Sequence, residues 1–416
     1  MLIKSLSLKD FKCFEQVDID FGKITLLTGA NSSGKSSLIY ALLGIMQSKY
    51  FPQYFALNGE LINMGGFDDV LRKKAEEKKF QIDLSLLSDW RVHNYKTTWL
   101  RNNLNEQPEL KELTIDWFSL KEINDDKAIF EEIYSKKEFD KIKLDVSDKN
   151  RYAIIQKSED EFTVRHNVPV NVRDEILERE ACAYFMDLSD EPYFFNYIGS
   201  FRLPPERTYY RKPKAGKVSV NGEGYIDQII EWEELDKEKY NQLIKVITEI
   251  ELFKSIESNK MKGGRFEMSI KVNENSELAS LTDVGFGISQ FLPIIVADLQ
   301  LDDDSCLVVS QPEIHLHPKI QATLGDYFCK QVNNTDKQYI VETHSEYLIN
   351  RMRLLIVKGE LQPEDVALYF MENDGIKTTT HKIELTKDGQ IRNAPQGFFD
   401  TYEMDVMDIA LYASAQ

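Results

Sequence analysis

The sequence has few of the features that mark a secreted or membrane-bound protein. No apolar run approaches the ~20 residues that a helix needs to cross a bilayer, and the run at 38–46 is among the longest. Charged residues interrupt the start of the chain, so no signal peptide is predicted. We therefore expect a cytoplasmic protein without a membrane segment. The four cysteines form no C-x-x-C pair, which excludes a disulfide framework and indicates reduced thiols: Cys13, Cys182, Cys306 and Cys329.

Positive charge is outnumbered by negative charge. Lys and Arg number 51 against 69 Asp and Glu, which gives a net charge of −18 at pH 7. Such a surface repels polyphosphate at long range, so a nucleic-acid contact would have to come from a local basic patch or through a partner protein. Hydrophobic residues make up 42% and charged residues 29% of the 416 residues, which excludes a disordered or collagen-like chain.

The hydrophobic pattern predicts an α/β fold. Alternating apolar residues indicate strands in 1–28, and the apolar segment 36–47 indicates a buried helix. Two strand-then-helix units follow late in the chain, with strands at 306–309 and 339–341 and helices that begin near Pro318 and Ser345. Repeated units of this kind predict a parallel or mixed sheet flanked by helices.

The chain length allows two or three domains, or one large domain with an insertion. Residues 120–190 are rich in charge and poor in periodicity, so we expect an inserted, exposed α+β subdomain there. Residues 226–257 look helical. The predicted division is an N-terminal lobe at 1–95, a charged insertion at 96–195 and a C-terminal lobe at 196–416.

A phosphate-binding loop lies between the strand that ends at Thr28 and the following helix. Residues 29–36, GANSSGKS, match G-x-x-x-x-G-K-[ST] at every fixed position. Glycines let backbone N–H groups surround phosphate oxygens, and Lys35 supplies a positive charge to the β- and γ-phosphates. Ser36 offers a hydroxyl to Mg²⁺. The predicted ligands are ATP and Mg²⁺, and the predicted nucleotide-binding residues here are Asn31, Ser32, Ser33, Gly34, Lys35, Ser36 and Ser37.

Three later segments carry polar clusters beside apolar runs. VGFGISQ at 284–290 is a glycine-bearing turn that opens an apolar helix, in which Gly285, Gly287 and Ser289 suit an anion. An ordinary glycine turn before a core helix is the other interpretation. The strand at 307–309 leads into SQPEIHLHP, and the strand at 339–341 leads into ETHS.

This set of segments resembles the ABC-type ATPases of the OLD/RecF/SMC branch. Within that branch it resembles the stand-alone ATPases of bacterial anti-phage systems, such as the PtuA proteins of Septu. The resemblance covers residues 1–90 and 195–416. It identifies 29–36 as Walker A, 284–290 as a degenerate signature loop, 310–313 as the Walker B position, 315–318 as the D-loop, His344 as the switch histidine and 393–400 as a similar tail.

The resemblance implies that two heads enclose two ATP molecules, with the signature loop of one head reaching the γ-phosphate held by the other. It implies a homo-oligomer, either a dimer of heads or a larger assembly. Relatives with a built-in nuclease continue well beyond the position of Gln416, so we expect the nuclease to be a separate effector protein.

The Walker B position departs from the family pattern, in which two acids end the strand. Ser310 and Gln311 stand there instead. Ser310 would contact the metal only weakly through a water, and Gln311 can orient water but cannot accept its proton. Glu313 is the nearest carboxylate in sequence. With Gln311, Glu313 and His344 as candidate catalytic residues and Ser36 and Ser310 as candidate metal ligands, we expect tight ATP binding and slow hydrolysis.

Two further interpretations concern histidines and basic residues. His315, His317 and His344 could indicate zinc, but no third ligand has diagnostic spacing. The preferred interpretation is that His344 hydrogen-bonds the γ-phosphate and that His315 and His317 lie at the junction between two heads. The segment Arg202–Lys217 is the strongest basic patch, with Tyr209 and Tyr210 among its cations. It is either a solvated loop paired with acids such as Glu223, a nucleic-acid contact, or a contact to nucleotide or partner subunit. The rival functions are a RecF-like DNA-clamping ATPase and a scaffold that never turns nucleotide over.

Overall fold

The computed structural model describes residues 2–48, 51–52, 54–88, 91–122, 128–131, 137–139, 153–158, 161–166, 193–210, 212, 216–395 and 397–398. A central seven-stranded sheet runs through the molecule in the order β11-β16-β17-β3-β18-β19-β20. Its parallel strands are β11 (Phe195–Ile198), β16 (Cys306–Ser310), β17 (Gln338–Glu342), β3 (Ile24–Gly29) and β18 (Val366–Asn373). The antiparallel strands β19 (Thr378–Leu385) and β20 (Ile391–Arg392) complete it. The expected α/β fold is confirmed.

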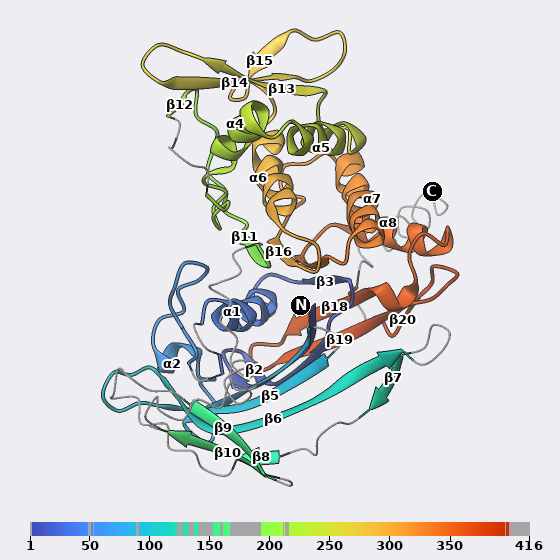
Figure 1. Cartoon of the computed structure of the whole chain (residues 1–416). Helices are drawn as coiled ribbons and strands as arrows, with labels where there is room; N and C mark the ends of the chain where they lie inside the picture. Colours follow the sequence, from blue (N-terminus) through green and yellow to red (C-terminus); the bar gives the residue numbers. More distant parts are fainter. Residues whose placement is uncertain are drawn as a thin grey trace.

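Both faces of the central sheet are covered (Figure 1). On one face lie α6 (Phe286–Gln300), α7 (Pro318–Asn334) and α8 (Glu346–Val357), together with α4 (Tyr225–Leu235) and α5 (Lys237–Glu249). On the other lies α1 (Lys35–Met46). The apolar residues of β16 are continuous because both of its faces are buried. Leu307 and Val309 pack toward the helices, and Val308 packs toward α1.

A second, antiparallel sheet covers the outer side of α1. It contains β1 (Leu2–Phe11), β2 (Phe14–Asp20), β4 (Lys79–Ser88), β5 (Arg91–Arg101), β6 (Pro108–Glu122), β7 (Ala128–Glu131) and β8 (Lys137–Phe139). The short helix α2 (Phe67–Val70) lies between β2 and β4 in the chain, and β9 (Ala153–Ser158) pairs with β10 (Glu161–His166). The predicted domain boundary near residue 95 falls inside β5, which pairs with β4 and β6 along its length.

A small four-stranded sheet lies beyond α4 and α5, at the top of Figure 1. It consists of β12 (Tyr209–Tyr210), β13 (Ser255–Lys260), β14 (Arg265–Lys271) and β15 (Leu278–Ser280). The prediction that 226–257 is helical is confirmed up to Glu249 and wrong at its end. The chain reverses at Glu251, whose φ is 57°, and residues from Ser255 onward pair with β14.

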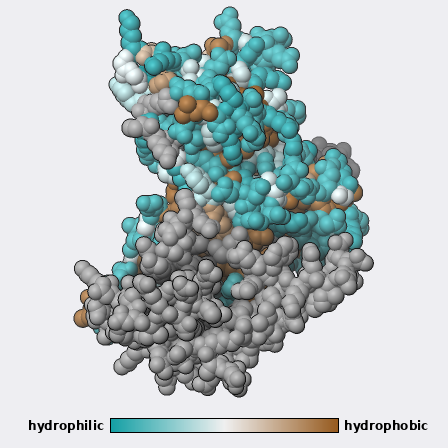
Figure 2. Space-filling view, in the orientation of Figure 1, coloured by the Kyte–Doolittle hydropathy of each residue, from teal (hydrophilic) through white to brown (hydrophobic). Residues whose placement is uncertain are grey.

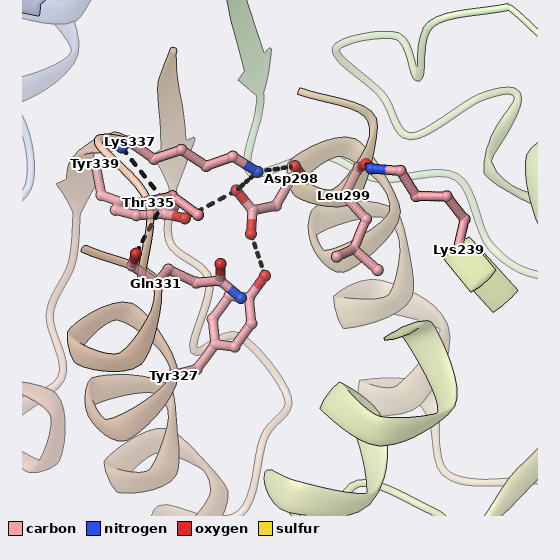
Figure 3. Close-up of polar contacts among 8 residues, drawn as sticks. All are labelled: Lys239, Asp298, Leu299, Tyr327, Gln331, Thr335, Lys337 and Tyr339. Atoms are coloured by element: carbon pink, nitrogen blue, oxygen red, sulfur yellow. Dashed lines mark hydrogen bonds and ion pairs between the residues drawn. The ribbon is translucent and has the colours of Figure 1, made fainter. Parts of the chain in front are cut away.

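A buried polar cluster ties α6 to β17 (Figure 3). Asp298 is fully buried near the end of α6, and its carboxylate accepts hydrogen bonds from the hydroxyls of Tyr327 and Tyr339. The Lys337 ammonium lies 3.6 Å from the same carboxylate and donates to the Asp298 carbonyl at 2.7 Å. A buried ion pair with its hydrogen bonds satisfied holds its elements in one arrangement, because removing one partner leaves an uncompensated charge.

The surface is mainly hydrophilic, and the described cysteines are free thiols. Figure 2 shows a mainly hydrophilic face over the helical lobe, with apolar groups scattered across it. No helix in the described ranges is both long and apolar enough to cross a membrane. Cys13, Cys306 and Cys329 are free thiols, and burial raises the pKa of Cys329 to about 11. Cys182 lies outside the described residues.

Candidate functional site

The turn between β3 and α1 is shaped by two glycines with positive φ. Gly29 has a φ of 133°, and a Cβ there would lie 2.1 Å from the carbonyl oxygen of Met371. Gly34 has a φ of 105° and caps α1, whose first residue is Lys35. Larger residues cannot adopt this course without strain. The predicted strand–loop–helix arrangement around GANSSGKS is therefore present, with the positive end of α1 directed at the loop.

Lys35 is held against this loop. Its ammonium donates to the carbonyl oxygens of Gly29 at 2.9 Å and Ala30 at 2.8 Å, and to the Ser33 hydroxyl at 3.4 Å. The residue is only 3% exposed. Burial lowers the pKa of Lys35, and the nearby carboxylate of Glu342 opposes that effect.

A cavity of about 480 Å³ opens at this loop, a volume within the ~300–1,000 Å³ typical of small-molecule sites. It gathers the P-loop together with the ends of β11, β16 and β17. Its lining residues are Cys13, Asn31, Ser32, Ser33, Gly34, Lys35, Ser36, Ser37, Tyr40, Tyr197, Ser200, Ser310, Gln311, Glu342 and His344. All seven predicted P-loop residues thus line one cavity with Ser310, Gln311 and His344, which lie far away in sequence.

Glu342 joins the two predicted metal ligands and was missed by sequence reasoning. One of its carboxylate oxygens accepts a hydrogen bond from the Ser36 hydroxyl at 3.1 Å, and the other accepts one from the Ser310 hydroxyl at 2.9 Å. A signal was present in the sequence, because Glu342 is the last residue of a buried apolar strand. The resemblance to a switch histidine instead identifies His344, which lies two residues later.

Gln311 and His344 flank this carboxylate. The Gln311 N–H donates to the Glu342 carbonyl at 2.7 Å. Gln311, the first residue after β16, has the left-handed backbone conformation, with a φ of 51°. Burial and the Lys35 ammonium lower the pKa of His344, which favours the neutral imidazole at neutral pH.

Glu313 does not line the cavity. Its Oε1 accepts the backbone N–H of His344 at 2.6 Å, and burial raises its pKa. Nearby, the Arg202 guanidinium donates to the carbonyls of Ser310 at 2.7 Å and Gln311 at 3.0 Å, and burial lowers its pKa to about 10. In this arrangement Glu313 and Arg202 hold the backbone that carries Gln311 and His344.

The predicted signature residues lie elsewhere in the chain, at the start of α6. A Cβ on Gly287 would lie 2.4 Å from the carbonyl oxygen of His315, so this glycine permits close packing on the loop after β16. Gly285 is the N-cap, and a Cβ there would meet open space. Ser289 is 1% exposed, and its hydroxyl donates to the Phe286 carbonyl at 2.8 Å. None of the three lines the P-loop cavity of its own chain.

His315 and His317, both exposed, make contacts with residues of their own chain. His317 is the N-cap of α7, and its Nδ1 accepts the Lys319 N–H at 3.3 Å. The His315 ring contacts the Phe286 ring edge-to-face with centroids 5.0 Å apart. Across the described ranges, no group of three or more His, Cys, Asp or Glu side chains is placed to hold a metal ion.

The basic segment Arg202–Lys217 does not form one exposed patch in its described part. Arg207 pairs with Asp283 at 2.8 Å, and Lys212 pairs with Glu223 at 2.9 Å. Lys217 donates to the Phe195 carbonyl, and burial lowers its pKa to about 8. Arg211 and Lys214 lie outside the described residues.

Because these cations already pair with acids, we predict that replacing Arg207 and Lys212 with glutamate leaves DNA binding unchanged. The measurement is the affinity of the wild type and of the double variant for duplex DNA at several salt concentrations. A phosphate contact contributes about one unit to the slope of log affinity against log salt concentration. A slope that falls by about two units in the double variant would instead assign this segment to nucleic acid.

Comparison with known proteins places the site in a family. Residues 24–350, more than half of the 416-residue chain, match the family described as "AAA domain, putative AbiEii toxin, Type IV TA system". Residues 361–409 match the family described as "Protein of unknown function (DUF3696)". No curated protein matches the sequence.

Solved structures of low identity were also matched. The SMC head domain from Thermotoga maritima is 14% identical, with a TM-score of 0.43 and coverage of 92% of this chain and 100% of that one. An SmcHead bound to the C-winged helix domain of ScpA is 13% identical, with a TM-score of 0.45 and coverage of 93% and 99%. An Smc head from Pyrococcus furiosus bound to the C-terminal domain of ScpA is 10% identical, with a TM-score of 0.44 and coverage of 92% and 96%.

The assignment rests on the family model instead, because its match includes the P-loop, the end of β16, Glu342 and His344. The chain therefore belongs to the AAA-domain family that carries this description.

Proposed function

We propose that this chain binds Mg·ATP at the P-loop cavity, hydrolyses it slowly and uses the bound nucleotide as a signal for assembly with a separate effector. The observation that carries the proposal is the composition of the cavity wall. A complete P-loop with Lys35 and Ser36 faces a strand end that offers Ser310 and Gln311 where hydrolytic relatives are expected to have two acids.

The side chains at the cavity fit the chemistry of Mg²⁺. The Ser36 hydroxyl and the Glu342 carboxylate are oxygen donors that already contact each other at 3.1 Å. Mg²⁺ prefers oxygen ligands and is commonly held by one or two side chains together with phosphate oxygens and water. When bound, the ion would neutralise charge on the triphosphate.

Slow hydrolysis follows from the group that faces the attacking water. Gln311 lines the cavity and can orient a water by hydrogen bonding, but its amide cannot accept a proton at neutral pH. Glu313 has the right chemistry, yet it binds the His344 backbone and does not line the cavity. We expect steady-state turnover below about 1 s⁻¹, at the low end of enzyme rates.

Assembly through a second head is supported by the position of the signature residues. Gly285 is exposed at the start of α6, and the P-loop cavity does not include it. In the proposed assembly it approaches the nucleotide held by a second copy, as in the ATPases that the sequence resembles. The test is the size of the purified protein with and without Mg·ATP, measured by light scattering. A monomer of unchanged mass at saturating Mg·ATP contradicts this part of the proposal.

A pair of glycine substitutions separates assembly from packing. We predict that Gly287→Ala destabilises the fold by about 1–3 kcal/mol, because its Cβ overlaps the His315 carbonyl. Gly285→Ala meets open space and costs less than about 1 kcal/mol, but it loses ATP-induced assembly because its methyl group obstructs a second copy. The measurements are thermal unfolding and light scattering. Assembly of Gly285→Ala at the wild-type ATP concentration would remove Gly285 from the interface.

The effector part of the proposal has two supports. The family description names a toxin of a type IV TA system, and two similar Smc heads are described as bound to a domain of ScpA. By the resemblance to PtuA-like ATPases, the effector is a nuclease that acts in anti-phage defence. The test is coexpression with a candidate nuclease followed by measurement of its activity with and without Mg·ATP. An activity that is independent of the wild-type chain contradicts this role.

A further inference from the structure

The strand order places one carboxylate between the P-loop and the end of β16. Strand β17 pairs with β16 on one side, where Glu342 is opposite Ser310. It pairs with β3 on the other side, where Glu342 is opposite Leu27. Glu342 therefore stands one strand nearer to the P-loop than Ser310 does.

The two oxygens of Glu342 are directed at two serines. Oε1 accepts from Ser36, the last residue of the P-loop motif, and Oε2 accepts from Ser310. Ser310 in turn lies 3.3 Å from the Tyr197 hydroxyl. The carboxylate thus has a fixed orientation with one oxygen beside the hydroxyl expected to bind the metal.

Among the described residues, no basic side chain forms an ion pair with this carboxylate, although the Lys35 ammonium lies near enough to act on its charge. Glu342 is 7% exposed, and none of the ion pairs among the described residues includes it. The nearby Lys35 ammonium instead donates to the carbonyls of Gly29 and Ala30. A buried carboxylate held by two serine hydroxyls but by no ion pair is only partly compensated, so a cation that enters with the nucleotide would stabilise it further. Among the described residues that line the cavity, Glu342 is the sole acid.

We propose that Glu342 is the acidic residue that holds the divalent cation of bound nucleotide, in place of the acid that β16 lacks at Ser310. The inference rests on the proposed ATP binding and assigns a residue to it. Ser310 then acts as a positioning residue, because its hydroxyl fixes the second oxygen of the same carboxylate. One side-chain carboxylate together with a serine hydroxyl and phosphate oxygens is an ordinary ligand set for Mg²⁺.

The test is the metal dependence of nucleotide affinity in Glu342→Gln. The affinity for fluorescent ATP is measured in Mg²⁺ and in EDTA for the wild type and the variant. We expect the ratio of the two affinities to fall about tenfold or more in the variant, while the affinity in EDTA is kept or improved because a negative charge is lost. Electron paramagnetic resonance of Mn²⁺ in the nucleotide complex gives a second readout, in which the variant binds Mn²⁺ more weakly.

Three variants control the result. Glu372 on β18 is hydrogen-bonded to His381 at 3.1 Å and does not line the cavity. We therefore expect Glu372→Gln to keep the wild-type ratio of ATP affinity in Mg²⁺ to ATP affinity in EDTA. Ser310→Ala lowers the ratio less than Glu342→Gln does. Ser310→Asp added to Glu342→Gln returns an acid to β16 and recovers the ratio.

A wild-type ratio in Glu342→Gln overturns the inference and leaves the proposed function standing. A wild-type chain that binds no ATP in either buffer overturns the proposed function itself. If Glu342→Gln fails to bind ATP in EDTA, then Glu342→Ala, which also removes the carboxylate, replaces it. A ratio in Glu342→Ala equal to that of the wild type also overturns the inference.

Discussion

Replacing Gln311 with glutamate is expected to raise the rate of ATP hydrolysis by about 10²-fold. Gln311 lines the cavity at the end of β16, and its backbone N–H is bonded to the Glu342 carbonyl. Glutamate has nearly the same shape, so the bond and the left-handed backbone are kept, while the carboxylate can accept a proton from the attacking water. The measurement is phosphate release at saturating Mg·ATP.

Two variants show whether the gain comes from the carboxylate. Gln311→Ala removes the amide and is expected to lower the residual rate, because no group then orients the water. Glu313→Gln in the Gln311→Glu background should keep most of the gain, since Glu313 does not line the cavity. A Gln311→Glu protein with the wild-type rate would show that Gln311 does not face the attacking water.

Loss of the Lys35 side chain is expected to weaken ATP binding by roughly 100-fold or more, because several charge-assisted hydrogen bonds to phosphate disappear. The ammonium of Lys35 lies within hydrogen-bonding distance of the Gly29 and Ala30 carbonyls, at the floor of the cavity. The measurement is the affinity of the Lys35→Ala variant for ATP by calorimetry in Mg²⁺ buffer.

A matched lysine provides the control for this experiment. Lys330 on α7 pairs with Glu249 at 2.6 Å and does not line the cavity, so Lys330→Ala should bind ATP like the wild type. Thermal unfolding of both variants shows whether the fold is kept. Wild-type affinity in a folded Lys35→Ala protein would contradict ATP binding at this loop, and with it the proposed function.

Local sequence patterns were sufficient to predict the P-loop and most of the helices and strands around it. The pattern at 29–36 specifies a strand, a tight turn and a helix through its glycines, and the structure begins α1 at Lys35. The helices that follow β16 and β17 begin at Pro318 and Glu346, close to where the sequence predicted them. These features depend on contacts between residues close together in the chain, so periodicity and capping residues reveal them.

Sequence reasoning was less successful where neighbours come from distant segments. Residues 255–257 were expected to be helical, and they instead begin the strand Ser255–Lys260 because β14 pairs with it. Glu313 was chosen as the carboxylate nearest to Gln311 in sequence. The chain turns after Gln311, however, so Glu313 faces the His344 backbone and Glu342 occupies the cavity.

The sequence by itself determined that this chain has a nucleotide-type P-loop, an α/β fold and no pair of acids at the end of β16. Only the tertiary structure decided which acid stands beside the P-loop serine. Glu342 and Ser36 are 306 positions apart, and they meet because β17 is inserted between β16 and β3 in the sheet. The order of strands in a sheet is set by long-range packing, and no local pattern encodes it.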